Sequence, residues 1–371
     1  MPQYTVDYME HALSLAELAL GYTSPNPAVG AVIVKDGVVV GMGYTQPPGS
    51  AHAEIMALQQ AGERSDGATM YVILEPCCHQ GRTPPCTQAI IDAGISVVHA
   101  SMLDPNPLVS GKGVKCLKEA GIQVHIGEYE EKAKEINESY IKFITTGIPF
   151  VIAKFAMSLD GKIATRNGDS KWISNDHARR YIHKIRHVVD AVMVGVNTVI
   201  IDNPQLSARG CCSGRGGKII MQPLRVIVDS KGRTPLVARV FKEPGKTIIA
   251  VTGPFDEGKT AQYKEVGAEV VEIPDKAKSG MVNLEKLLEV LGQRHITSIL
   301  VEGGSQLLGS LFDEGLIDKI IVFIAPIIIG GEKASTAVAG SGVEKISEAF
   351  RLQNVKVQNL EDNVLVSGYV R

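Results

Sequence analysis

One histidine and two cysteines in the first quarter of the chain are spaced as ligands of a single zinc ion. His52 lies in a His-Ala-Glu segment, and Cys77 and Cys86 each follow a proline. Three protein ligands leave the fourth tetrahedral position of zinc for water, as in catalytic sites. The fold must therefore bring three separate segments to one point, which constrains it more than any other feature does.

Glu54 lies two residues after His52 and is the candidate proton carrier of this site. Zinc lowers the pKa of bound water, so a neighbouring carboxylate can move protons near neutral pH. His-x-Glu followed by Pro-Cys is typical of zinc-dependent nucleobase deaminases, in which the glutamate does not bind the metal.

The second cysteine ligand has competitors. Deaminases usually have two residues between the cysteines, whereas eight separate Cys77 from Cys86. Either a loop is inserted, or Cys78 or His79 is the third ligand instead. The local pattern favours Cys86, because prolines precede a predicted helix at 87–94, and a helix N-terminus lowers a thiol pKa.

The neighbouring segments indicate how the ligands could meet. Cys77 follows an apolar run, 70–74, that predicts a buried strand, and sites in α/β sheets collect at the carboxyl ends of strands. His52 and Glu54 would point to different sides of a regular helix. They can share a metal only if it lies beyond the N-terminal end of a helix that starts near Glu54.

Length and composition favour a two-domain globular enzyme. The chain has 371 residues, of which 44 % are hydrophobic and 21 % charged, and a net charge of −2 that provides no footprint for a nucleic-acid backbone. Acidic residues in the N-terminal segment predict an amphipathic helix rather than a signal peptide. Since no apolar run approaches 18 residues and six cysteines do not resemble a disulfide framework, we expect a protein of the reducing cytoplasm, without a membrane span.

Hydrophobic periodicity predicts an α/β protein with two sheets. In the first half we expect an Asp-Gly hairpin over 31–41 and, after it, alternating helices and strands that end in one long charged helix, 130–146. A Gly-Ile-Pro segment places the domain boundary at 147/148. In the second half we expect strands at 150–156, 191–194, 226–228, 247–251, 270–271, 299–301 and 319–325. Cys211 and Cys212 are expected in an exposed loop between them.

A strand that runs into two glycines is the most informative segment of the second half. Val301-Glu302-Gly303-Gly304-Ser305 leads into an apparent helix with Ser305 as its predicted N-cap. Glycines allow close backbone approach and helix N-termini attract phosphate, so the pattern fits phosphate or dinucleotide binding as well as a plain tight turn. The other polar segments are expected to be loops, and the single Trp172 is expected in the core.

These motifs together resemble the bifunctional deaminase–reductases of riboflavin biosynthesis, the RibD or RibG family, over nearly the whole chain. The resemblance rests on segments of both halves: 24–30, 52–54, 75–77, 84–86 and 104–107, then 158–162, 169–173, 202–204, 301–305, 325–326 and 330–331.

The resemblance implies a cytidine-deaminase-like domain at 1–147 and a dihydrofolate-reductase-like domain at 148–371. The first would use one Zn²⁺ per chain to deaminate a diaminopyrimidinone that carries a phosphoribosylamino group. The second would use NADPH to reduce the ribosyl group to a ribityl chain. It further implies a cytoplasmic homo-oligomer that acts on this small molecule, without nucleic acid or membrane partners.

The resemblance also implies roles for particular residues. Zinc would be bound by His52, Cys77 and Cys86, with Glu54 as catalytic proton carrier. NADP contacts would fall on Ala156, Trp172, Thr198, Asp202, Ser230, Gly304, Ser305, Gly309 and Ser310. Substrate contacts would fall on Asn26, Ser170, Arg186, Leu206, Arg209 and Glu302. Arg186 or Arg209 could hold the substrate phosphate, whereas the cations for the 2′-phosphate of NADPH are not placed by the sequence.

Three other functions compete with this one. A nucleic-acid-editing deaminase would need a basic groove that the charge balance does not support. A non-catalytic zinc scaffold would need a closed shell with Cys78 or His79 as fourth ligand. A reductase with a decayed deaminase domain conflicts with the intact set of His52, Glu54, Cys77 and Cys86.

Overall fold

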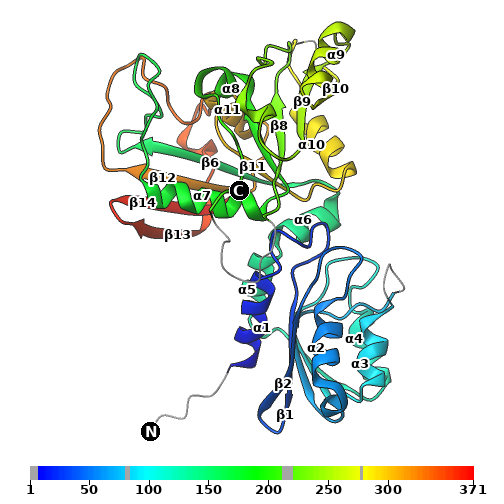
Figure 1. Cartoon of the computed structure of the whole chain (residues 1–371). Coiled ribbons are helices and arrows are strands. Elements are labelled where there is room, and N and C mark those ends of the chain that lie inside the picture. The colour runs from blue at the N-terminus through cyan, green and yellow to red at the C-terminus, as the bar shows by residue number, and fades with distance from the viewer. Residues whose placement is uncertain (1–6, 80–83, 211–219, 276–278) are drawn as a thin grey trace. The chain divides into compact units, whose positions relative to one another are not determined.

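The computed structural model describes residues 7–79, 84–210, 220–275 and 279–371. It divides into two compact units, Met1–Gly147 and Ile148–Arg371. Both units combine helices with a central sheet (Figure 1), so the predicted α/β class is confirmed. Cys211 and Cys212 lie outside the described residues. None of the helices within these ranges is long and apolar enough to cross a membrane.

The first unit is built on a five-stranded sheet in the order β2-β1-β3-β4-β5. Figure 1 shows α1 and α5 on one face of this sheet and α2, α3 and α4 on the other. The strands are β1 (Gly30–Lys35), β2 (Val38–Tyr44), β3 (Thr69–Leu74), β4 (Val97–Met102) and β5 (Gln123–Ile126). The helices are α1 (Tyr8–Glu17), α2 (Ala53–Ala61), α3 (Cys86–Asp92), α4 (Lys112–Glu119), α5 (Glu130–Ile136) and α6 (Glu138–Thr146).

Glycines in the sheet let the helices approach it closely. A Cβ atom on Gly43 of β2 would lie 2.3 Å from the carbonyl oxygen of Ala53, the first residue of α2, and one on Gly30 of β1 would lie 2.0 Å from the carbonyl oxygen of Ala12 in α1. No side chain fits there, so these two helices rest directly on the strands.

The long helix predicted over 130–146 is wrong, because the chain breaks at Asn137 into α5 and α6. Asn137 is 2 % exposed, and its φ of −106° and ψ of 18° leave the helical region. Its side-chain amide accepts a hydrogen bond from the N–H of Ala28 at 2.9 Å and donates to the carbonyl of the same residue at 3.1 Å. The break therefore anchors the loop that precedes β1.

The second unit contains a nine-stranded sheet in the order β10-β9-β8-β7-β11-β6-β12-β14-β13. The strands that were predicted are β6 (Phe150–Ser158), β7 (Ala191–Gly195), β8 (Leu224–Val228), β9 (Thr247–Thr252), β10 (Ala268–Ile273), β11 (Ser298–Val301) and β12 (Lys319–Ala325). The hairpin of β13 (Leu352–Leu360) and β14 (Asn363–Val370) was not predicted, because β13 is polar and exposed along most of its length.

Helices cover both faces of the larger sheet. Buried side chains of α10 (Leu284–Gln293) and α11 (Ser305–Asp313) pack on one face, and those of α7 (Asp176–Val188), α8 (Val196–Asp202) and α9 (Glu257–Glu265) pack on the other. Alternate residues of β6 belong to different cores. Val151 packs in the core with α10 and α11, and Ile152 packs in the core with α7, α8 and α9. Burial on both faces explains why the central strands read as continuous apolar runs.

Candidate functional site

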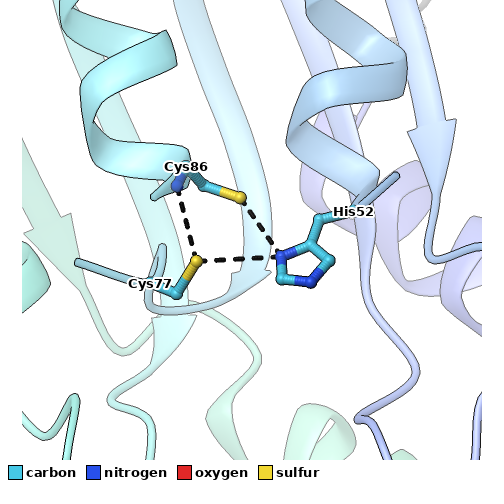
Figure 2. A group of neighbouring side chains, drawn as sticks. All are labelled: His52, Cys77 and Cys86. Carbon is cyan, nitrogen blue, oxygen red and sulfur yellow. Dashed lines mark hydrogen bonds between the residues drawn. The ribbon is translucent and has the colours of Figure 1, made fainter. Parts of the chain in front are cut away.

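Three side chains of the first unit converge where two helices begin and one strand ends (Figure 2). His52 is the N-cap of α2, Cys86 is the first residue of α3, and Cys77 follows β3. Their ligand atoms all lie within 4.8 Å of one another. The three ligand atoms thus meet at the N-terminal end of α2, with Glu54 in its first turn, as the spacing of His52 and Glu54 required.

The distances between these atoms fit one tetrahedral metal ion. His52 Nδ1 lies 3.3 Å from Cys86 Sγ and 3.7 Å from Cys77 Sγ. Zinc–nitrogen and zinc–sulfur bonds of about 2.0 and 2.3 Å place the two donor atoms about 3.5 Å apart at the tetrahedral angle. Among the residues that the structure describes, Cys78 and His79 are not part of any such group, so the closed four-ligand shell has no support.

Hydrogen bonding and burial shift the pKa values of the Cys77 and Cys86 thiols in opposite directions. The Cys77 sulfur accepts a hydrogen bond from the thiol of Cys86 and another from its backbone N–H at 3.4 Å, which lowers the pKa of Cys77 to about 4. That hydrogen bond and burial raise the pKa of Cys86. The hydrogen bond with Cys77 raises the pKa of His52. A cation among these atoms would favour both thiolates, because an opposite charge stabilises an anion.

Glu54 lies in the first turn of α2, beside the three converging atoms. Its side chain is 4 % exposed, and burial raises the pKa of its carboxyl to about 7. A carboxyl group with such a pKa can both accept and release a proton near neutral pH. This placement matches the role that the sequence predicts for it.

Glu75 was not predicted as a site residue, yet it shapes the loop that carries Cys77. Its carboxylate accepts backbone hydrogen bonds from Asp104 at 3.2 Å, Gly111 at 2.9 Å and Val114 at 3.0 Å. A Cβ atom on Gly113 would lie 2.1 Å from the carbonyl oxygen of Pro76. Glu75 thus fixes the segment 75–77 against the start of α4. The only sequence signal for this role was the position of Glu75 directly before Pro-Cys.

Asn26, the predicted substrate contact of the first unit, lies in the loop anchored by Asn137. Its backbone N–H donates to the carbonyl oxygen of Thr23 at 2.8 Å, and the residue is partly exposed. Its role as a substrate contact stays a prediction.

A cavity of about 360 Å³ in the second unit gathers many of the predicted reductase residues. Those that line it are Ala156, Ser170, Trp172, Arg186, Asp202, Arg209 and Glu302. Trp172 is 73 % exposed, so the expectation that it belongs to the core is wrong. Its indole ring lies under the guanidinium of Arg179, 4.5 Å from the ring centroid.

A buried ion pair lines this cavity. Arg186 donates from Nε and Nη2 to the two carboxylate oxygens of Glu302 at 2.5 and 2.9 Å. Lys154 Nζ lies 3.9 Å from the same carboxylate, and burial lowers the pKa of this lysine. Lys154 was not predicted, because its only signal was a charge inside an apolar strand.

The ion pair also distinguishes the two arginines that were predicted to bind phosphate, because it occupies donors of only one of them. Glu302 occupies one edge of the Arg186 guanidinium through Nε and Nη2, and Nη1 donates to the carbonyl oxygen of Ser207 at 3.2 Å. Arg209 is exposed and donates to the side chain of Gln205. Arg209 therefore keeps more capacity for an anion than Arg186 does.

The remaining predicted reductase contacts are not among the residues that line this cavity. Thr198 is in α8, and its Oγ1 lies 3.5 Å from where a Cβ atom of Gly304 would be. The predicted N-cap is wrong by one residue, since Gly304 is the N-cap of α11 and Ser305 is its first residue. Ser230 follows β8, and its hydroxyl accepts from the N–H of Val282 at 3.1 Å.

Three of the predicted cofactor and substrate contacts are partly or fully buried within the protein. Gly309 packs against backbone, because a Cβ atom there would lie 2.3 Å from the carbonyl group of Ala339. Ser310 is a partly buried residue of the same helix. Leu206 is 2 % exposed and belongs to the core, so its predicted contact with substrate stays a prediction.

Comparison with known proteins identifies both halves. Residues 3–102 match the cytidine and deoxycytidylate deaminase zinc-binding region, and residues 149–366 match the RibD C-terminal domain. The riboflavin biosynthesis protein RibD of Aquifex aeolicus is 44 % identical over 97 % of each chain. The chain belongs to the RibD family. The family's cytidine-deaminase-like and dihydrofolate-reductase-like fold prediction is thereby confirmed.

Solved structures agree with this assignment over the full length. Acinetobacter baumannii RibD aligns with a TM-score of 0.87 at 38 % identity, covering 98 % of both chains. A Thermotoga maritima protein described as a diaminohydroxyphosphoribosylaminopyrimidine deaminase and 5-amino-6-(5-phosphoribosylamino)uracil reductase aligns with a TM-score of 0.82 at 36 % identity, again over 98 % of both. The prediction of a bifunctional RibD enzyme, a zinc-dependent deaminase joined to an NADPH-dependent reductase, is confirmed at the level of the family.

Proposed function

We propose that residues 1–147 deaminate 2,5-diamino-6-(5-phosphoribosylamino)pyrimidin-4-one and that residues 148–371 reduce the product to 5-amino-6-(5-phosphoribitylamino)uracil. The observation that carries the proposal is the convergence of His52, Cys77 and Cys86 beside a buried Glu54 in a chain whose other half matches the RibD reductase. The alternative functions lack support, because the charge is −2 and the ligand group has three members.

In the deaminase half, His52, Cys77 and Cys86 hold the metal and Glu54 moves the protons. Zinc, when bound there, supplies a water molecule of lowered pKa as the nucleophile. Glu54 would take up a proton as the nucleophile forms and would pass one to the departing amino group, which leaves as ammonia. Its burial keeps the carboxyl beside the reacting carbon and away from bulk solvent. Asn26 contacts the substrate from the neighbouring loop.

In the reductase half, the cavity binds the phosphoribosyl part of the substrate. NADPH, when bound, supplies the hydride that reduces the opened sugar at its first carbon. Lys154, the buried cation beside Glu302, is suited to deliver the accompanying proton, and Arg209 binds the substrate phosphate. Ser170 donates to Asp202 at 3.1 Å, which orders the cofactor side of the cavity.

We also propose that the enzyme is a cytoplasmic homo-oligomer without nucleic acid or membrane partners. Support comes from the weakly negative net charge, the free cysteines among the described residues and the edge strand β13, where Val355 and Val357 are 49 % and 63 % exposed. Light scattering on the purified protein tests the assembly, and a monomer at all concentrations would contradict it.

A coupled assay tests the two activities. Purified zinc-replete protein is given the diaminopyrimidinone substrate, and ammonia release and NADPH oxidation are followed separately. We expect both, and a chelator should stop ammonia release while reduction of the already deaminated compound continues. Ammonia without NADPH oxidation would contradict the reductase assignment, and the absence of both would contradict the substrate.

A further inference from the structure

The phosphate of the substrate needs more donors than Arg209 alone can supply. A phosphate group carries a charge of about −1.5 to −2 near neutral pH and has three strong acceptor oxygens. The planar guanidinium of an arginine donates in parallel to two of them. A phosphate bound by Arg209 therefore leaves one oxygen for a second donor, which we expect among the residues that line the cavity of the second unit.

One face of α7 presents three nitrogen-bearing side chains to this cavity. Arg179, His183 and Arg186 all line it. They are four and three residues apart in the helix, and residues with this spacing lie on the same helix face. The helix thus places one histidine, the side chain that titrates near neutral pH, between two arginines.

Both arginines of this face already have protein partners. Arg179 donates to the carbonyl oxygen of Ser174 at 2.6 Å, and its guanidinium lies 4.5 Å from the ring centroid of Trp172. Arg186 is paired with the carboxylate of Glu302 through Nε and Nη2. The histidine between them has more capacity for a ligand than either arginine.

The imidazole of His183 is oriented by one of its two nitrogens and keeps the other. Nδ1 donates to the carbonyl oxygen of Ser207 at 3.1 Å, and since a carbonyl only accepts, this nitrogen carries a proton. Within the described part of the chain, Nε2 makes no hydrogen bond. A neutral imidazole would offer an acceptor at Nε2, whereas an imidazolium offers a donor. Only the imidazolium can therefore donate from Nε2 to a phosphate oxygen.

The contact with Ser207 also places the ring beside the free arginine of the cavity. Ser207 lies two residues before Arg209 in the chain, and its carbonyl oxygen accepts from Arg186 as well as from His183. Arg209 lines the same cavity and is exposed. His183 and Arg209 are thus two uncommitted donors on adjoining parts of one wall.

The charges around His183 link its protonation to the binding of phosphate. The charged residues that line the cavity with it are Lys154, Arg179, Arg186, Asp202, Arg209 and Glu302. Burial and the positive charges of Arg186 and Arg209 lower the pKa of His183, whereas Glu302 raises it. A bound phosphate dianion would raise this pKa, because an opposite charge favours the charged form. The proton and the phosphate therefore favour each other's binding, so affinity is highest below the lowered pKa and falls as the pH rises above it.

We propose that His183, as an imidazolium that donates from Nε2, binds the substrate phosphate together with Arg209 and makes the substrate affinity of the reductase increase as the pH falls. This inference rests on the proposed reductase function and adds a titratable residue that the predicted substrate contacts do not include. Arg209 supplies a constant charge, whereas His183 supplies one that depends on pH.

The test follows NADPH oxidation with 5-amino-6-(5-phosphoribosylamino)uracil at about pH 6 and about pH 8.5, on either side of the usual histidine pKa. His183→Asn keeps a donor for the carbonyl of Ser207 but has nothing in place of Nε2. At the lower pH it should raise KM by about 10-fold, as expected for a hydrogen bond to a charged group, and change kcat by less than about twofold. At the higher pH the neutral imidazole cannot donate, so the two KM values should agree within about threefold. Titration of the phosphate itself cancels, because each comparison is made at one pH.

Two further variants separate the proposed contact from a general defect. His177→Asn is the matched control, because His177 is a histidine of the same helix that does not line the cavity and is paired with Glu361 on the surface. Its KM and kcat should stay within about twofold of the unaltered protein at either pH. His183→Gln places a neutral amide donor near the position of Nε2. Its KM should lie below that of His183→Asn by a factor that does not change with pH, since neither side chain titrates.

A binding measurement isolates the phosphate from the rest of the substrate. Ribose 5-phosphate and ribose are titrated by calorimetry at neutral pH in two buffers of different ionisation enthalpy. Compared with His183→Asn, the unaltered protein should bind ribose 5-phosphate more tightly and take up a larger fraction of a proton per ligand. Ribose should not distinguish the two proteins. Ammonia release should be the same in all variants and reports that the other unit is intact.

The inference is overturned if His183→Asn leaves KM unchanged at the lower pH, if it raises KM by the same factor at both pH values, or if the loss appears in kcat instead. An equal loss in His177→Asn would also overturn it. Failure of the proposed function looks different, since the unaltered protein would then not oxidise NADPH with this substrate at any pH.

Discussion

Gly43→Ala tests whether the position of α2 controls deamination. The added Cβ atom would lie 2.3 Å from the carbonyl oxygen of Ala53, 2.6 Å from the Cβ of Met56 and 2.7 Å from the backbone nitrogen of Ala57. Two of these three atoms are helix backbone, so no side-chain rotation relieves the clash. The φ of Gly43 is not in the left-handed region, so the effect is purely steric.

The displacement can be worked out from these contacts. Cβ contacts below 3.0 Å are essentially never seen, so α2 must move away from β2 by at least the difference between 3.0 and 2.3 Å, which is 0.7 Å. His52 is the N-cap of this helix and Glu54 lies in its first turn. A misplacement of about 1 Å can cost a catalyst about 10²-fold. We therefore expect kcat/KM for ammonia release to fall by about 10- to 100-fold, with a loss of about 1–3 kcal/mol in the free energy of unfolding.

Gly37→Ala provides the matched control. Gly37 lies at the turn between β1 and β2 with a φ of +76° and no heavy atom within 4 Å of its missing Cβ. Alanine there strains the backbone at a cost of about 1 kcal/mol but displaces no helix. We expect its kcat/KM for ammonia release to stay within about twofold of the unchanged enzyme. NADPH oxidation with the deaminated compound should be unaffected in both variants.

Ammonia release, zinc content and chemical denaturation are measured on the same preparations. The reasoning fails if Gly43→Ala loses stability but keeps full kcat/KM, because the helix could then move without disturbing the site. It also fails if Gly37→Ala loses as much deaminase activity, because strain anywhere in the hairpin would then suffice.

Three other substitutions probe the two sites. Glu54→Gln should lower kcat for ammonia release by about 10²- to 10⁴-fold while elemental analysis still finds zinc, and loss of the metal would contradict its role as proton carrier. Glu75→Gln should weaken zinc binding by about 10- to 100-fold in competition with a chromophoric chelator, and unchanged binding would show that the loop holds without this carboxylate. Glu302→Ala should destabilise the protein by about 3–5 kcal/mol because it leaves buried cations unpaired, and an unchanged melting temperature in calorimetry would contradict the buried ion pair.

The sequence predicted those parts of the fold that depend on local pattern. The Asp-Gly hairpin, the buried strand before Cys77 and the helix that begins at Cys86 all lie where the sequence placed them, apart from small shifts of their ends. Each is determined by residues within about ten positions, through turn chemistry, apolar runs and prolines before a helix.

The features that it missed depend on residues far away in the chain. Asn137 breaks a helix because Ala28, 109 positions earlier, takes its side-chain amide. The cavity that Trp172 lines also includes Glu302 and Phe323, which are distant in the chain, so the local pattern could not show that this ring is exposed. β13 escaped prediction because an exposed edge strand has no apolar face for a pattern to reveal.

The charges of the reductase cavity show why its chemistry was harder to derive than the metal site. The metal ligands are recognisable as a set, because a His-Ala-Glu segment followed by two Pro-Cys segments combines residue types that bind zinc. The chemistry of the cavity instead depends on which charges cancel. Glu302 is paired with Arg186, which lies 116 positions away in the chain, and the same carboxylate is close to Lys154. After this cancellation Arg209, which lines the cavity and is exposed, keeps its donors for the substrate phosphate. Which charges cancel could be argued only once the sheet order was known, because β11, which Glu302 follows, lies beside β6, which carries Lys154.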